Sequence, residues 1–102
     1  MYIVQKLNSK SNGELTVDFE YGKIYKTLQE ANQECITSLY YHRDHSKKLN
    51  KLVGEYFVIV DTERNFQKCW YLFNGEVDYV RANSFEEVET FAYSMANTKY
   101  YA

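Results

Sequence analysis

The sequence predicts an α+β fold. We expect a single domain over residues 1–102, in which a mostly antiparallel sheet of five or six short strands packs against two or three helices. Three observations predict this fold. Residues 55–81 read as a meander of three antiparallel strands, and two Ser/Thr-x-x-Glu sequences, beginning at Thr27 and Ser84, each precede an apolar pattern with helical spacing.

The meander contains the most specific local signal, the dipeptide Asn74-Gly75 between two apolar runs. Both central residues of a type I′ turn need a positive φ, which Asn and Gly tolerate best. The run 56–60 is apolar at every position, as expected for a central strand that is covered on both faces. A two-residue turn at Asn74-Gly75 predicts five strand pairs: Phe73 with Glu76, Leu72 with Val77, Tyr71 with Asp78, Trp70 with Tyr79, and Cys69 with Val80.

The predicted hairpin has two different faces, because side chains alternate across a strand. One face carries four large apolar side chains, and we expect it to form core: Trp70, Leu72, Val77 and Tyr79. The other face mixes rings with carboxylates: Tyr71, Phe73, Glu76 and Asp78. This mixture favours contact with water or with a partner. The alternative is that a helix covers this face, so that the two rings are core and only the two carboxylates reach solvent.

The N-terminal part predicts two or three further strands. Residues 1–7 read as a short strand, and the alternation of apolar and polar residues over 15–20 predicts a second, half-buried strand. We expect Tyr21-Gly22 to break this strand and residues 23–26 to continue as a short third one. Both halves of the chain therefore run from strands to a helix. This order indicates either a duplicated ββα unit or two unrelated segments with the same succession of local sequence signals.

The two Ser/Thr-x-x-Glu sequences are capping boxes, in which the hydroxyl accepts a hydrogen bond from the backbone amide three residues later and the Glu side chain, such as Glu30, reaches back to the amide of the capping residue. The first opens an apolar pattern that extends to Val53, so the helix either runs for about 25 residues or breaks near residues 44–46. We expect a weakening there, because Asp, His and Ser are poor helix formers. The second opens a helix with this apolar stripe: Phe85, Val88, Phe91, Ala92 and Met95.

Composition and charge argue against several classes of protein. A net charge of −2 gives no general attraction to nucleic acid or anionic lipid. The sequence shows no signal peptide and no apolar run of membrane-spanning length, so we expect a cytoplasmic protein without membrane contact. Cys35 and Cys69 have no paired spacing, and we expect buried, reduced thiols instead of a disulfide. Eleven tyrosines are typical of a recognition surface.

His42 and His45 are the clustered metal-ligand residues of the sequence. Histidines three residues apart share a helix face and could hold one metal ion together. Nothing nearby supplies a third ligand with a recognised spacing, and His42 lies on the apolar stripe, so we expect no metal and no cofactor. The sequence also lacks a phosphate-binding glycine loop and an activated cysteine, so we expect no enzyme. A small enzyme or metal site around these histidines is the third-ranked alternative.

Nucleic-acid binding through the predicted helix 40–53 is the second-ranked alternative. Cations there could bind phosphate while Tyr40 and Tyr41 stack on bases. However, a solvated helix face has the same composition, and the rest of the chain is acidic. The cations of this segment are Arg43, Lys47, Lys48 and Lys51.

The absence of a catalytic constellation, a cofactor motif and a strongly basic surface favours non-enzymatic binding of another protein. In size and composition the chain resembles the small inhibitors and adaptors that bacteriophages and mobile elements encode, including counter-defence proteins such as anti-CRISPRs. This resemblance implies an inhibitor or adaptor that acts on a host protein. The sequence leaves homodimerisation through a free strand edge open. The predicted binding residues are Tyr71, Phe73, Glu76 and Asp78, with Tyr40 and Tyr41 as a second cluster.

Overall fold

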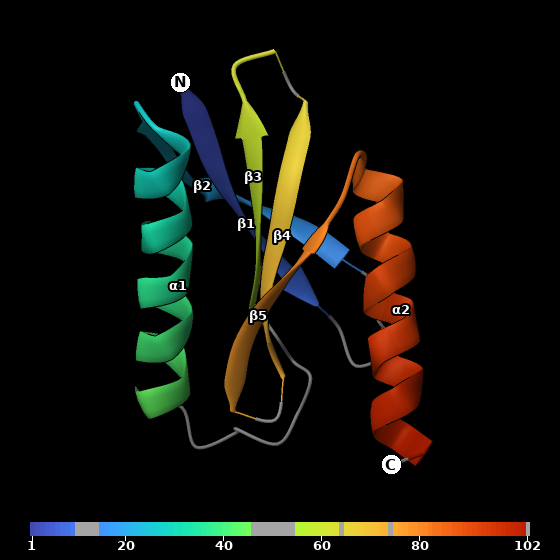
Figure 1. The fold of residues 1–102 in the computed structure, drawn as a ribbon. Helices are drawn as coiled ribbons and strands as arrows, with labels where there is room; N and C mark the ends of the chain where they lie inside the picture. The colour runs from blue at the N-terminus through green and yellow to red at the C-terminus, as the bar shows by residue number, and fades with distance from the viewer. Residues whose placement is uncertain (10–14, 46–54, 64, 74, 102) are drawn as a thin grey trace.

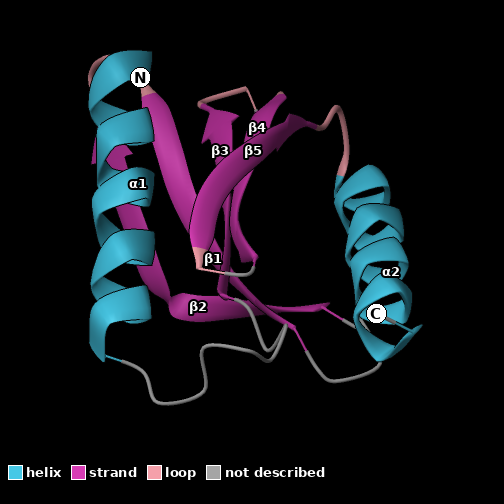
Figure 2. Cartoon of the chain, turned by 60° about the horizontal axis from the view of Figure 1, so that its bottom comes forward, coloured by secondary structure: helices cyan, strands magenta, loops and turns pink. Residues whose placement is uncertain are grey.

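The computed structural model is a three-layer α+β arrangement, with one helix on each face of a five-stranded sheet (Figures 1 and 2). It describes residues 1–9, 15–45, 55–63, 65–73 and 75–101. The predicted α+β fold is confirmed. In chain order the elements are β1 (Tyr2–Ser9), β2 (Leu15–Tyr25), α1 (Leu28–His45), β3 (Glu55–Asp61), β4 (Phe66–Phe73), β5 (Glu76–Arg81) and α2 (Phe85–Tyr101).

The strand order is β2-β1-β3-β4-β5, and all neighbouring strands are antiparallel. β3 therefore lies in the centre of the sheet, whereas β2 and β5 form its two edges. The prediction for residues 56–60 is confirmed, because all five side chains are buried. The duplicated ββα unit stays a prediction, because two unrelated segments with the same succession of local sequence signals would show the same order of elements.

The β4–β5 hairpin has the predicted register at all five pairs, from Phe73–Glu76 at the turn to Cys69–Val80. Gly75 adopts a φ of +78°, in the left-handed region that glycine tolerates best. The two-residue turn therefore determines which side chains of β4 and β5 share a face.

The N-terminal hairpin differs from the prediction in one respect. Tyr21-Gly22 does not break the second strand, because β2 continues through Gly22 to Tyr25. An irregularity between the pairs Gln5–Gly22 and Leu7–Val17 sets the single residue Lys6 opposite residues 18–21 of β2. Such a bulge interrupts the side-chain alternation while the ladder continues on either side of it. The expected short third strand is therefore the second half of β2.

The hydroxyl half of both predicted capping boxes is present, whereas the Glu87 carboxylate accepts from the Asn83 amide instead of the Ser84 amide. Thr27 Oγ1 accepts a hydrogen bond from the Glu30 amide at 3.1 Å, and Ser84 Oγ accepts one from the Glu87 amide at 3.2 Å. The described helix α1 ends at His45, and the rest of the pattern to Val53 lies outside the described residues. Among the described residues, neither helix is long and apolar enough to cross a membrane.

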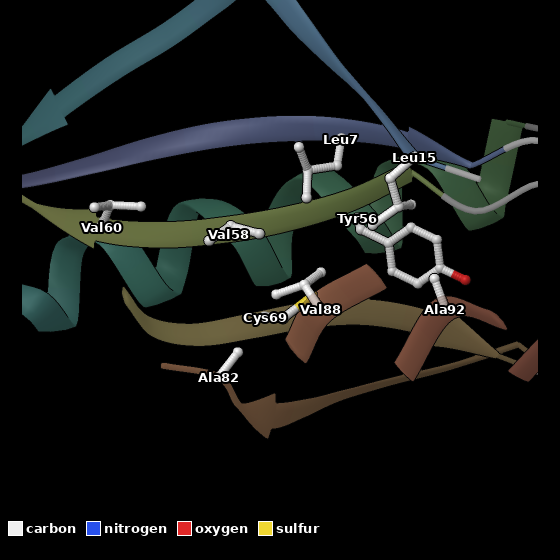
Figure 3. Close-up of a cluster of buried hydrophobic side chains, with 9 residues drawn as sticks. All are labelled: Leu7, Leu15, Tyr56, Val58, Val60, Cys69, Ala82, Val88 and Ala92. Atoms are coloured by element: carbon white, nitrogen blue, oxygen red, sulfur yellow. The ribbon is translucent and has the colours of Figure 1, made fainter. Parts of the chain in front are cut away.

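The sheet separates two hydrophobic cores. Figure 3 shows the core on the α2 side, where small side chains of α2 meet the sheet: Leu7, Leu15, Tyr56, Val58, Val60, Cys69, Ala82, Val88 and Ala92. The core on the α1 side contains Val4, Ala31, Cys35, Leu39, Phe57, Ile59 and Trp70. Alternate residues of β3 contribute to the two cores, so one central strand supports both helices.

Candidate protein-binding surface

The predicted surface around Tyr71 lies on the α2 side of the sheet and is partly covered. The Tyr71 ring packs against the Phe91 ring of α2, with 5.0 Å between the centroids. Burial, together with the nearby Asp78 carboxylate, raises the pKa of the Tyr71 hydroxyl. Tyr71 therefore serves helix–sheet packing, as the alternative interpretation expected. Glu76 and Asp78 are exposed on this face, while the Phe73 side chain lies outside the described part of the chain.

The second predicted cluster, Tyr40 and Tyr41, is exposed but divided between two sides of α1. The Arg43 guanidinium carbon lies 4.5 Å from the Tyr40 ring centroid, and Nη1 donates to the Gly75 carbonyl at 3.0 Å. Arg43 therefore joins the end of α1 to the β4–β5 turn and holds Tyr40 on that side. Tyr41 stacks instead on His45 one turn later, with 4.0 Å between the centroids.

The histidines and cations of α1 are already engaged in local contacts. His45 Nδ1 lies 2.9 Å from the Tyr41 carbonyl oxygen. Within the described ranges, no three His, Cys, Asp or Glu side chains are grouped so that they could hold a metal ion. Arg43 Nε donates to Asp44 at 3.1 Å, in addition to its bond to the turn. The other predicted nucleic-acid-binding residues lie outside the described residues: Lys47, Lys48 and Lys51.

Tyr79 is the aromatic residue that the sequence analysis assigned incorrectly. We expected it in the core with Trp70, but 44% of its surface is exposed, whereas Trp70 is buried. The Trp70 indole N–H donates to Asn32 of α1 at 3.0 Å, and the Trp70 and Tyr79 ring centroids lie 4.9 Å apart. α1 therefore covers Trp70 on β4, and Tyr79, one strand farther out on the edge strand β5, remains half exposed.

Two cations share the face of the sheet on which Tyr79 lies, and one of them contacts its ring. Lys68 Nζ lies 4.3 Å from its centroid, a cation–π distance. Lys68 pairs directly with Arg81 across β4 and β5, so the two cations share the α1 side of the sheet with Tyr79. In the described part of the chain, neither cation has a carboxylate within 4.0 Å. Like charges directly opposite each other are unfavourable, and no carboxylate of a described side chain neutralises this pair.

These residues form two groups along the α1 side of β5, which together we call the β5 strip. Tyr40 and Arg43 lie at the end near Gly75, and Lys68, Tyr79 and Arg81 lie at the other end. The six-residue separation of Gly75 and Arg81 corresponds to a strip of about 20 Å. It combines two exposed tyrosines with three cations. The sequence contains one indication of this strip: the register set by the Asn74-Gly75 turn, continued one pair beyond Cys69–Val80, sets Lys68 opposite Arg81.

The two cysteines offer no reactive site. Both are free and buried, as predicted. Burial raises the pKa of the Cys35 thiol and of the Cys69 thiol to about 12 each. At neutral pH they are therefore protonated, and the thiolate that a nucleophile requires is absent.

Comparison of the chain with protein-family models, with curated proteins and with solved structures found no match.

Proposed function

We propose that this protein is a non-enzymatic module that binds another protein through the β5 strip. The supporting observation is the environment of Tyr79, whose half-exposed ring contacts the Trp70 ring and the Lys68 ammonium, and Lys68 Nζ lies 5.8 Å from the Trp70 centroid as well. Tyr, Trp and Arg are enriched in protein interfaces and at their energetic hot spots. A ring that is already held in place loses little conformational entropy on binding, so its burial contributes more to affinity.

The charges of the β5 strip favour an acidic protein surface as the partner. Arg43, Lys68 and Arg81 contribute three cations, and Asp44 is the carboxylate paired with one of them. Complementary charge steers association and excludes partners of the wrong sign. The carboxylates Glu76 and Asp78 point to the other face of β5, where they would repel the same partner. The two faces of this edge therefore prescribe one orientation of the complex.

The resemblance to phage and mobile-element proteins suggests what the binding does: it inhibits or recruits the bound protein. An inhibitor or adaptor that acts on a host protein in the cytoplasm stays a prediction. The β5 strip supports binding as such, and the consequence for the host protein depends on which of its surfaces is covered.

Affinity capture with matched variants tests this proposal. The tagged protein, Tyr79→Ala and Arg81→Glu are incubated with lysate of the host, with and without nuclease. The control is Tyr93→Ala, because Tyr93 of α2 is 40% exposed, close to the 44% of Tyr79. We expect a nuclease-resistant protein partner whose affinity falls about tenfold or more with Tyr79→Ala, and also falls with Arg81→Glu. The control should bind like the wild type.

Two outcomes would contradict the proposal. Equal retention by the wild type, Tyr79→Ala and Arg81→Glu would show that the β5 strip is not the binding surface. Recovery of nucleic acid, with nothing retained after nuclease treatment, would favour the nucleic-acid alternative and the segment that contains Lys47, Lys48 and Lys51.

A further inference from the structure

The outward-facing backbone groups of the edge strand β5 follow from the hairpin register. In a two-residue hairpin the pair that flanks the turn, Phe73–Glu76, exchanges backbone hydrogen bonds, and later pairs alternate between bonded and non-bonded. Val77, Tyr79 and Arg81 therefore occupy non-bonded pairs, and their N–H and C=O groups point away from β4. A further strand added to the sheet would bind these groups.

The Asp78 side chain blocks a backbone donor in the middle of this edge. Its Oδ1 accepts a hydrogen bond from the Tyr79 amide at 2.7 Å. The central outward-facing donor of β5 is therefore occupied by the side chain of the preceding residue, and the same side chain places a negative charge beside the edge. Charged side chains on edge strands are a known protection against edge-to-edge pairing.

We propose that the outer edge of β5 is a pairing surface for β5 of a second copy of this chain, and that the Asp78 carboxylate keeps this surface closed by occupying the Tyr79 amide. Pairing of two such edges would extend the sheet across two molecules. It would also cover the region around Tyr79, so the same carboxylate keeps the β5 strip accessible. This inference uses the backbone of β5 and does not depend on the proposed function.

Two-fold symmetry restricts the registers of such a pair. Residues directly opposite each other in an antiparallel pair have side chains on the same face, and outward-facing residues must meet outward-facing residues. A two-fold axis at Tyr79 meets both conditions and sets Val77 opposite Arg81 of the second copy. An axis at Asp78 would instead set two carboxylates side by side, which is unfavourable. The register centred on Tyr79 pairs residues 77–81.

Light scattering during size-exclusion chromatography tests whether the Asp78 carboxylate prevents pairing of two β5 edges. Asp78→Ala removes the acceptor, whereas Asp78→Asn keeps an acceptor oxygen. Glu76→Ala is the matched control, because it removes the neighbouring exposed carboxylate of the same face. At one protein concentration we expect Asp78→Ala at twice the mass of the wild type. The wild type, Asp78→Asn and Glu76→Ala should all have the monomer mass.

A wild-type dimer, or a monomeric Asp78→Ala that is folded by far-UV circular dichroism, would overturn the proposal. A dimer of Asp78→Asn would overturn the role of the hydrogen bond. Asp78→Val provides a second variant without an acceptor, with the same expectation as Asp78→Ala, in case the alanine variant does not fold.

Cysteine cross-linking tests the register. In hydrogen-bonded antiparallel pairs the Cα atoms lie about 5.5 Å apart, within the range of a disulfide. Tyr79→Cys combined with Asp78→Ala should therefore form a disulfide-linked dimer under mild oxidation. The native thiols do not compete, because Cys35 and Cys69 are both fully buried. Tyr93→Cys in the same background is the control and should stay unlinked. Absence of the Tyr79→Cys cross-link would overturn the proposed pairing.

Discussion

Lys68 and Arg81 lie directly opposite each other on β4 and β5, on the same face of the sheet, and among the described residues neither has a carboxylate partner. Two like charges at such a pair oppose folding. The arrangement is explained if the charges serve an acidic partner, as proposed for the β5 strip.

The first prediction is that Arg81→Glu raises the free energy of unfolding by about 0.2–1 kcal/mol, because the new carboxylate would face Lys68 in a favourable cross-strand pair. Denaturant unfolding measures this change. Arg81→Gln removes the repulsion without adding attraction, so its stability should lie between those of Arg81→Glu and the wild type. If both variants are less stable than the wild type, the two cations do not repel each other significantly.

The second prediction concerns the link between α1 and the sheet. Asn32→Leu removes the acceptor of the Trp70 indole N–H and should cost about 1–3 kcal/mol, because the buried donor loses its partner. Trp70 is the single tryptophan, so its fluorescence reports both the local change and the unfolding transition. Asn32→Asp keeps an acceptor oxygen and should lose less stability. Equal losses in the two variants would contradict a role for the hydrogen bond.

The third prediction is a loss of stability at alkaline pH. In the unfolded chain the two thiols ionise near their ordinary pKa of 9.0, whereas in the folded protein burial raises the pKa of Cys35 and of Cys69 to about 12. The unfolded state therefore releases protons first, and the free energy of unfolding should fall as pH rises from 9 towards 12. Urea unfolding at a series of pH values measures this fall. Cys35→Ala and Cys69→Ala should each show a shallower decline, and an unchanged slope would contradict the assignment.

The fourth prediction separates packing from binding at Tyr71. A double-mutant cycle of Tyr71→Leu and Phe91→Leu should give a coupling energy of about 0.5–1.5 kcal/mol, as expected for an aromatic pair. Tyr71→Phe keeps the ring and should preserve most of the stability. Neither Tyr71→Phe nor Tyr71→Leu should alter capture of the partner. A loss of partner binding with Tyr71→Phe would place the hydroxyl in the interface.

The parts of the fold that depend on neighbours in the chain could be predicted from the sequence. Asn74-Gly75 predicted the register of β4 and β5 pair by pair, because the turn needs a positive φ and its length determines which residues meet. Thr27 and Ser84 predicted the helix starts for the same local reason. The predicted strand break at Tyr21-Gly22 was wrong, because a bulge opposite Lys6 changes the alternation without ending the strand.

The candidate site was less predictable, because it depends on where the helices lie. Alternation assigned Tyr79 correctly to the face of Trp70, but it does not reveal that the α1-side core reaches Val77 of β5 and leaves Tyr79 half exposed. Alternation also assigned Tyr71 and Asp78 to one face, where Phe91 of α2 covers the first and leaves the second exposed. The order of the strands decides which of them becomes an edge, and no single local pattern contains that order.

The strand order also has a consequence for synthesis on the ribosome. β1 pairs with β3, so that Val4 lies beside Ile59, but α1 is made between these strands. The emerging N-terminal half therefore carries Val4, Cys35 and Leu39 without the strands that complete their core. The α1 side can close once β3 and β4 have left the exit tunnel, whereas the α2 side must also wait for α2, the last element of the chain. Until then the nascent chain presents an unfinished apolar layer, the kind of surface that chaperones bind.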